Sequence, residues 1–300
     1  MNAAAKSIAA MRSLYRASPE TEFAEAARSR GLSIFGPAIG DGVLHRVAVE
    51  GDKRGSRNGW YLLHLDGVPA GAFGSWKGGW RETWRSGGHS EVTASERERL
   101  NAAFATAKQQ READTLQRWQ QASERALKIW QSATTADPLH PYLARKSVQA
   151  HGIRQLGDQL LVPMRDANGV LWNLQTISAD GFKLFQKGAR KTGTYHAIGG
   201  PVVDVLNITE GYATGASIYA ATSQPVAIAF DCGNLTQVAR VLRAKYLQAR
   251  ITLCADNDIA TPGNPGLTKA KMAAAAIGGR IAIPPDGFND FNDAAREMRP

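Results

Sequence analysis

The sequence predicts an α/β protein, α+β overall, whose last hundred residues form a parallel sheet flanked by helices. Apolar strand-like runs and helical patterns alternate from residue 202 to residue 283, as is typical of a parallel sheet with helices on both faces. Earlier in the chain, short alternating runs separated by turn residues indicate antiparallel sheets instead. Residues 201 to 300 carry 9 basic and 9 acidic residues, whereas residues 1 to 90 carry 12 and 8 and residues 137 to 200 carry 8 and 4.

Taken in order, the chain is predicted to have four parts. Residues 1–90 form a small α+β module, because three short strands between residues 43 and 76 include the hairpin signal Asp66-Gly67. Residues 91–136 form a helical connector, one long helix or two in tandem, since no Pro or Gly interrupts residues 91 to 132. Residues 137–200 form a basic mixed α+β subdomain around a hairpin at residues 160 to 177, and residues 201–300 form the parallel α/β domain.

Composition excludes several classes of protein. A hydrophobic content of 43% is ample for a packed core, and no run of 18 apolar residues or signal-peptide pattern is present. We therefore expect a cytoplasmic protein with no membrane partner. Cys232 and Cys254 are too few for a disulfide framework or a cysteine-based zinc site. No P-loop pattern occurs, which argues against an ATP-driven motor.

Two of the predicted strands in the last part end in carboxylates. Val205–Thr209 is followed by Glu210 and Gly211, and Ile251–Ala255 is followed by Asp256 and Asp258. Parallel strands present their carboxyl ends at one edge of the sheet, so these acids should lie together, with Gly211 letting the backbone turn off its strand. Hard oxygen ligands suit Mg²⁺ and the transfer of phosphoryl or nucleotidyl groups. The alternative is that the acids only cap helices or lie at solvated strand ends.

Two segments could bind nucleic acid. The stretch from Trp76 to Arg85 interleaves tryptophans with basic residues, which suits base stacking and phosphate binding on a single strand. The same tryptophans could instead close the core of the small sheet, and both interpretations remain open for different rings. The Gly-containing loop at residues 186 to 196 groups cations that could bind phosphates.

These motifs resemble a known family. Glu210-Gly-Tyr-Ala, Asp256-Asn-Asp258 and the acidic tail at residues 287–293 are similar to the Toprim fold of bacterial-type primases, topoisomerases and certain nucleases. Upstream, residues 139–145, 162–169 and 182–188 are similar to the basic subdomain that precedes Toprim in primases. The whole pattern resembles the DNA primases of plasmids and phages.

The resemblance implies a DNA primase that makes short RNA primers on single-stranded DNA from ribonucleoside triphosphates, in plasmid, phage or mobile-element replication. It implies Mg²⁺ or Mn²⁺, held by the catalytic residues Glu210, Asp256 and Asp258 with Asp290 in support. A replicative helicase is a possible further partner. The residues expected to bind template and triphosphate are Arg145, Lys146, Lys183, Lys187, Arg190, Lys191, Trp76, Lys77, Trp80 and Trp84.

The sequence departs from the replicative bacterial primases at several points. Residues 1 to 136 contain no cysteine, so the N-terminal module is expected to work without zinc. Thr214 and Asn292 occupy positions where those primases carry aspartate, which leaves one carboxylate fewer for a second metal ion and keeps open whether the site holds one metal ion or two. The sequence ends directly after the Toprim-like part, so the resemblance includes no helicase-interaction domain.

Two alternatives stay open, because an acidic metal site does not distinguish making a phosphodiester bond from cutting one. The first is a Toprim nuclease that uses the same acids. The second is a non-catalytic replication accessory protein that binds single-stranded DNA.

Overall fold

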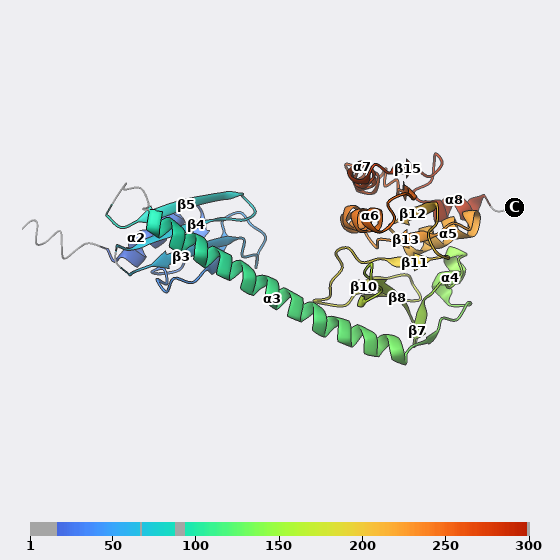
Figure 1. Ribbon diagram of the computed structural model, residues 1–300, viewed down its shortest axis with the longest axis horizontal. Helices are drawn as coiled ribbons and strands as arrows, with labels where there is room; N and C mark the ends of the chain where they lie inside the picture. The colour runs from blue at the N-terminus through green and yellow to red at the C-terminus, as the bar shows by residue number, and fades with distance from the viewer. Residues whose placement is uncertain (1–16, 67, 88–93, 299–300) are drawn as a thin grey trace, which may run out of the picture. The chain divides into compact units, whose positions relative to one another are not determined.

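The computed structural model describes residues 17–66, 68–87 and 94–298 (Figure 1). The chain divides into two compact units, residues 1–114 and residues 115–300, and the division falls within the 39-residue helix α3, Ala94–Ser132. The sequence left open one long helix or two in tandem between the two units, and the structure has one uninterrupted helix. The two units are described separately below.

The first unit combines one helix with a five-stranded antiparallel sheet. Helix α2, Pro19–Arg28, begins after Ser18, whose hydroxyl accepts a hydrogen bond from the Thr21 amide, and is followed by Gly31 at a φ of +82°. The strands lie in the sheet in their sequence order. They are β1 Leu32–Ser33, β2 His45–Val49, β3 Gly59–His64, β4 Ala70–Ser75 and β5 Trp80–Arg85.

The predicted small antiparallel sheet is confirmed, with two additional strands, β1 and β5. The three expected strands appear as β2, β3 and β4, and residue 67 of the expected hairpin turn lies outside the described residues. Strand β5, which contains two of the tryptophans, was not expected as a strand, because aromatic and basic residues interleaved with Gly suggested a binding loop. It pairs with β4 along its whole length.

The second unit begins with an antiparallel sheet. Its strands lie in the order β10-β9-β8-β7-β6, and the end of α3 packs on it through Ala126 and Trp130, which contact Leu161 and Leu174. The predicted hairpin and third strand are confirmed as β8, β9 and β10. The elements are β6 Thr134–Thr135, α4 Pro141–Lys146, β7 Arg154–Leu156, β8 Gln159–Arg165, β9 Leu171–Ile177 and β10 Lys183–Phe185.

The third sheet has the order β11-β13-β12-β14-β15 and the predicted strand and helix alternation. The expectation of a purely parallel sheet is wrong at one edge, where β11 pairs antiparallel with β13. Strand β11 has only three residues and begins with His196, so the sequence analysis placed its start at the end of the basic loop, residues 186 to 196. The elements are β11 His196–Ile198, β12 Val205–Thr209, α5 Tyr212–Thr222, β13 Val226–Ile228, α6 Cys232–Lys245, β14 Arg250–Cys254, α7 Pro265–Ile277, β15 Arg280–Ala282 and α8 Phe291–Glu297.

Helices cover both faces of the third sheet (Figure 1). Helices α6 and α7 pack on one face, and α5 and α8 pack on the other. The core on the α5 face continues into the second sheet through Leu160, Val162 and Met164, and a backbone bridge joins Arg165 to Tyr195. The two sheets of this unit therefore share one core, which brings α4 and β10 toward the third sheet.

None of the helices in the described part of the chain is long and apolar enough to cross a membrane.

Candidate active site

Carboxylates gather at the carboxyl edge of the third sheet. Glu210 follows β12, and Asp256 follows β14, which is hydrogen-bonded to β12 as its parallel neighbour. Asp258 lies two residues further along the same loop. The structure thus brings together the three acids that the sequence predicted as one site, and we call this region the acidic edge.

A fourth carboxylate, Asp231, was missed by the sequence analysis. It follows β13, the other parallel neighbour of β12, and caps α6 by accepting a 3.0 Å hydrogen bond from the Asn234 amide. It also pairs with Lys191. The signal was the same as for Glu210: an apolar strand, then an acid, then a helix.

Burial and mutual repulsion perturb the central acids. Desolvation, followed by the charges of Asp256, Asp258 and Asp231, raises the pKa of Glu210 to about 8. Desolvation, with Asp290 and Asp258 next, raises the pKa of Asp256 to about 7, although Lys183 acts in the opposite direction. Burial and the neighbouring carboxylates therefore both disfavour full ionisation of these acids when no cation is bound.

The hydrogen bonding of these acids is also incomplete. Glu210 Oε1 and Asp256 Oδ1 are buried without a hydrogen-bond partner in the described structure. An unpaired buried carboxylate oxygen is costly, and a divalent cation is the natural partner of such oxygens. Among the residues that the structure describes, no three His, Cys, Asp or Glu side chains are already arranged as a metal-ligand set. The donor chemistry fits Mg²⁺, while the ligand geometry is not preformed.

Asp290 lies at the same edge but also caps a helix. It precedes α8 and accepts hydrogen bonds of 2.7 Å and 2.9 Å from the amides of Asn292 and Asp293. Asp290 therefore caps α8, as the alternative to metal binding predicted for these acids. Its charge still raises the pKa of Asp256.

Thr214 and Asn292, the two positions at which the sequence suggested a departure from replicative primases, are both buried. Thr214 lies in α5, and Asn292 lies in α8. The Asn292 amide donates hydrogen bonds of 2.8 Å to the carbonyl of Lys146 and 2.9 Å to the hydroxyl of Ser217. This side chain therefore connects α8 to α4 and α5.

Three of the six predicted basic residues in the second unit adjoin the acids. Lys183 lies over the Tyr142 ring, and desolvation and then Lys146 lower its pKa, while Asp256 and Asp290 act to raise it. Lys146 lies 3.5 Å from Asp293, and Lys191 pairs with Asp231 as described above.

The other three predicted cations have different surroundings. Arg145 donates a 2.9 Å hydrogen bond to the carbonyl of Ala179. Arg190 lies over Trp172, at 5.0 Å from the ring centroid, and Lys187 is exposed in the loop after β10. The basic subdomain thus presents cations in more than one place.

In the first unit the tryptophans fulfil different roles. Trp80 and Trp84 are half-buried and pack on the core, with Trp84 at 5.4 Å from the Phe23 ring. Trp76 is 40% exposed, and its ring lies near the guanidinium of Arg46. Lys77 forms a 2.6 Å ion pair with Asp52. Core packing therefore accounts for Trp80 and Trp84, and Trp76 is the ring that offers an exposed surface.

The glycine that the acidic edge needs is not the expected one. Gly211 has a φ of −98°, which any residue adopts, and a Cβ placed there would be 3.7 Å from its nearest neighbour, Thr214. A Cβ at Gly266, in the first turn of α7, would be 2.7 Å from the Asp256 carbonyl oxygen and 2.9 Å from an Asp258 carboxylate oxygen. Gly266 lets the Asp256 to Asp258 loop approach the start of α7, and only its position next to Pro265 hinted at this in the sequence.

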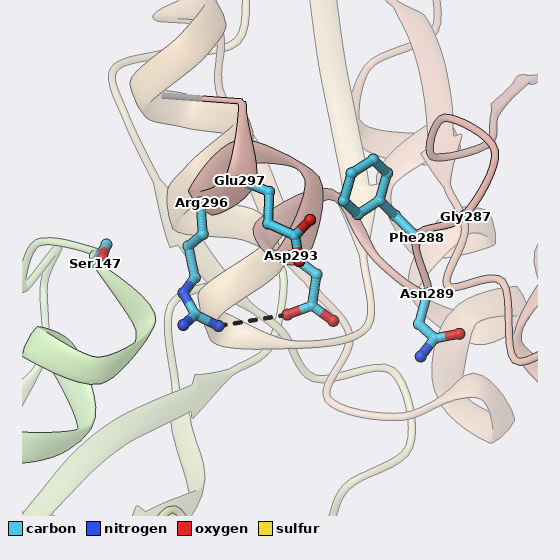
Figure 2. Close-up of a pocket in the computed structure, with 7 residues that line it drawn as sticks. All are labelled: Ser147, Gly287, Phe288, Asn289, Asp293, Arg296 and Glu297. Atoms are coloured by element: carbon cyan, nitrogen blue, oxygen red, sulfur yellow. Dashed lines mark ion pairs between the residues drawn. The ribbon is translucent and has the colours of Figure 1, made fainter. Parts of the chain in front are cut away.

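A cavity of about 420 Å³ adjoins α8 (Figure 2). It is lined by Ser147 at the end of α4, by the loop at residues 287–289 and by Asp293, Arg296 and Glu297. Figure 2 shows the Arg296 guanidinium directed at the Asp293 carboxylate, 3.8 Å away. Because Asp293 also pairs with Lys146, this cavity opens beside charged groups of the candidate site.

Comparison with known proteins agrees with this geometry. Residues 205–299 match the family model described as a Toprim domain, and this segment holds the whole acidic edge. The chain carries a Toprim domain. It is also 37% identical over 283 residues to the DNA primase TraC of Escherichia coli, a match that covers 89% of this chain and 26% of the relative. A second TraC primase of Escherichia coli is 37% identical over 282 residues, covering 89% of this chain and 19% of its own length.

The predicted relationship to plasmid-type primases is thus confirmed for this Toprim-domain chain, which spans about a quarter or less of the length of these relatives. Among solved structures, the primase fragment of the bacteriophage T7 primase-helicase protein is 15% identical with a TM-score of 0.41, covering 52% of this chain and 69% of that chain. The Aquifex aeolicus primase is 11% identical with a TM-score of 0.41, covering 93% and 80%.

Proposed function

We propose that this chain is the catalytic part of a DNA primase, which synthesises short RNA primers on single-stranded DNA by metal-dependent nucleotidyl transfer. The observation that carries the proposal is the acidic edge: buried, unpaired carboxylate oxygens at adjacent strand ends of a Toprim domain, in a chain related to TraC primases. Its setting is the replication of plasmids, phages or mobile elements, and its substrates are a single-stranded template and ribonucleoside triphosphates.

Glu210, Asp256 and Asp258 would hold Mg²⁺ or Mn²⁺, with Asp290 adding negative potential from the start of α8. When bound, the ion supplies charge neutralisation for the triphosphate and aligns the attacking hydroxyl. We propose no zinc in the N-terminal module, where residues 1 to 136 lack cysteine.

The cations beside the acidic edge act on the substrate phosphates. Lys183 and Lys146 lie next to the carboxylates, so they would neutralise triphosphate charge at the place where the ion is held. Lys191 would exchange its pairing with Asp231 for a phosphate. Arg145, Lys187 and Arg190 are further phosphate contacts, for template or triphosphate, in the same basic subdomain.

Trp76 is the tryptophan that we assign to template bases, with Lys77 beside it. The exposed surface of its indole ring supports base stacking. Trp80 and Trp84 had the same role in our sequence-based expectation, but their packing on the core of the first unit argues for a structural one.

The test is incorporation of labelled ribonucleotides on single-stranded DNA in the presence of Mg²⁺. We expect Asp256→Asn and Glu210→Gln to reduce primer synthesis by at least about 100-fold while single-stranded DNA binding is retained, because the acids act on the ion and not on the template. A matched control is Asp204→Asn, since Asp204 is an exposed acid at the opposite end of β12. Normal synthesis by either acidic-edge variant would overturn the proposal.

The same assay separates the alternatives. A Toprim nuclease would shorten a labelled DNA strand without incorporating nucleotides. A non-catalytic accessory protein would bind the strand and neither extend nor cut it.

A further inference from the structure

A second concentration of positive charge lies in the second unit, around Trp130 near the end of α3. A cavity of about 310 Å³ there is lined by Trp130, Pro163, Arg165, Tyr195 and Lys245, together with neighbouring backbone. We call it the Trp130 pocket. None of its lining residues belongs to the acidic edge.

The cations of this pocket are positioned but not neutralised. Arg165 donates a 2.9 Å hydrogen bond to the carbonyl of Gly169, and Lys245 donates a 2.7 Å hydrogen bond to the carbonyl of Ala167. Arg154, whose guanidinium lies 4.7 Å from the Trp130 ring centroid, donates to the Trp130 carbonyl at 2.6 Å. A neutral carbonyl fixes the direction of a cation without cancelling its charge, so the pocket keeps a positive potential.

The carboxylate in the lining is already engaged. Asp166 accepts hydrogen bonds from the amides of Asn168 and Val170 through one oxygen and from the Trp172 indole through the other, at 2.8 Å. In the described part of the chain, none of Arg154, Arg165 and Lys245 forms an ion pair with a carboxylate. Asp166 therefore shapes the turn and forms no ion pair with these cations, although its neutral donors leave its charge in place. The lining thus holds one carboxylate and two cations, Arg165 and Lys245, with Arg154 beside the Trp130 ring.

Desolvation is the main cause of the pKa shifts of the titratable groups here, and the charges of the neighbouring cations act in the same direction. Desolvation and the charge of Arg154 lower the pKa of Arg165. Burial lowers the pKa of His196 to about 4, opposed by its hydrogen bond to the His151 carbonyl and reinforced by Arg165. Holding two guanidinium groups close together is unfavourable unless an anion relieves the repulsion.

The shape of the pocket indicates the kind of anion. A volume of about 310 Å³ is at the lower end of the range for small-molecule sites, and Trp130 and Pro163 give it apolar walls. The guanidinium groups of Arg154 and Arg165 lie over the Trp130 ring, at 4.7 Å and 5.8 Å from its centroid. An anion with an organic portion matches this arrangement, because the organic portion would contact Trp130 and Pro163 beside these cations.

We propose that the Trp130 pocket binds a phosphate group of a nucleotide, either free or within a single strand, at a site separate from the acidic edge. Arg165 and Lys245 bind the phosphate, and Trp130 contacts the attached base or sugar. Lys245 is the last residue of α6 and Asp231 caps the other end, so about 20 Å of helix separates this cation from the acidic edge. The proposal does not depend on primer synthesis.

The test uses the whole chain in EDTA, so that metal-dependent binding at the acidic edge does not contribute. The probes are a labelled twelve-residue oligothymidylate and a fluorescent ATP analogue, followed by anisotropy at low salt. We expect Arg165→Gln and Lys245→Gln each to weaken binding of at least one probe by about tenfold. Weaker binding of the oligonucleotide alone identifies a strand site, and weaker binding of the ATP analogue alone identifies a free-nucleotide site.

Two controls make the result decisive. Lys271→Gln removes an exposed charge from α7, away from the pocket, and should bind both probes as the unmodified chain does. Lys245 is itself exposed, so Lys245→Gln keeps the fold even if the half-buried Arg165 does not tolerate substitution. Unchanged binding of both probes by Lys245→Gln, or an equal loss in Lys271→Gln, would overturn the proposal.

Discussion

The acidic edge and the Trp76 to Arg85 segment both contain residues that the sequence predicted as a site, but the fold brings the first group together and separates the second. Glu210 and Asp290 are 80 positions apart in the sequence, yet Asp256 interacts with both: its charge raises the pKa of Glu210, and the charge of Asp290 raises its own pKa. Trp76 and Trp80 are four positions apart, yet one is exposed and the other packs on a core. Parallel strands bring their carboxyl ends to one edge of the sheet, so acids far apart in the sequence meet there. Trp76 lies in the turn between β4 and β5, whereas Trp80 and Trp84 lie on β5 and share the face that packs on the core. Proximity in sequence is therefore a poor guide to a shared site when one residue lies in a turn and the other on a strand.

The largest effect expected from this comparison is on stability in the first unit. Trp84→Ala should lower the free energy of unfolding by about 2 kcal/mol, because the half-buried ring contacts Phe23 in the core. Trp76→Ala should change it by less than about 0.5 kcal/mol, since much of that ring is already exposed. Urea unfolding followed by circular dichroism measures both. Equal losses for the two variants would mean that the tryptophans do not differ in role.

A second prediction concerns the two glycines at the acidic edge. Gly266→Ala should reduce primer synthesis by about tenfold, because the new Cβ displaces the Asp256 carbonyl and the Asp258 carboxylate. Gly211→Ala should stay within about twofold, since its backbone is ordinary and its surroundings have room. Steady-state rates of primer synthesis test the pair. A larger loss for Gly211→Ala would restore the role that the sequence suggested.

A third prediction concerns how the stability of the chain depends on pH. The pKa of Glu210 is raised from 4.5 to about 8, so between these values the folded chain holds a proton that the unfolded chain releases. Stability is therefore lost as the pH rises through this window. Glu210→Gln removes the effect, and in EDTA its Tm should match that of the unmodified chain at pH 5 and exceed it by a few degrees at pH 8.5. Thermal scans at the two pH values suffice, and an unchanged or lower Tm for the variant at pH 8.5 would contradict the assignment.

Much of the fold was predictable because its signals are local. The strand and helix alternation after residue 202 and the hairpin before it follow from apolar periodicity and turn residues. Strand β11 was missed because three residues at a sheet edge carry almost no periodic signal. Strand β5 was missed because its aromatic residues suggested a binding loop.

The candidate site was predictable to the same extent. The sequence identifies Glu210, Asp256 and Asp258 because each follows a recognisable strand. The same rule, applied to β13, would have identified Asp231. The close approach of Gly266 and the positions of Lys146 and Lys183 depend on how α7, α4 and β10 pack against the third sheet. No local pattern contains that information.

Asn292 illustrates what a departure from a family pattern can mean. Its amide donates to a carbonyl of α4 and to a hydroxyl of α5, and a carboxylate in its place could donate neither hydrogen bond. Asn292 thus links α8 to α4 and α5. Because it binds the backbone carbonyl of Lys146, it also helps to position this lysine, whose ammonium group pairs with Asp293. An aspartate at position 292, which the resemblance to replicative primases led us to expect, would not simply add a metal ligand. It would also remove the hydrogen bond that helps to position Lys146.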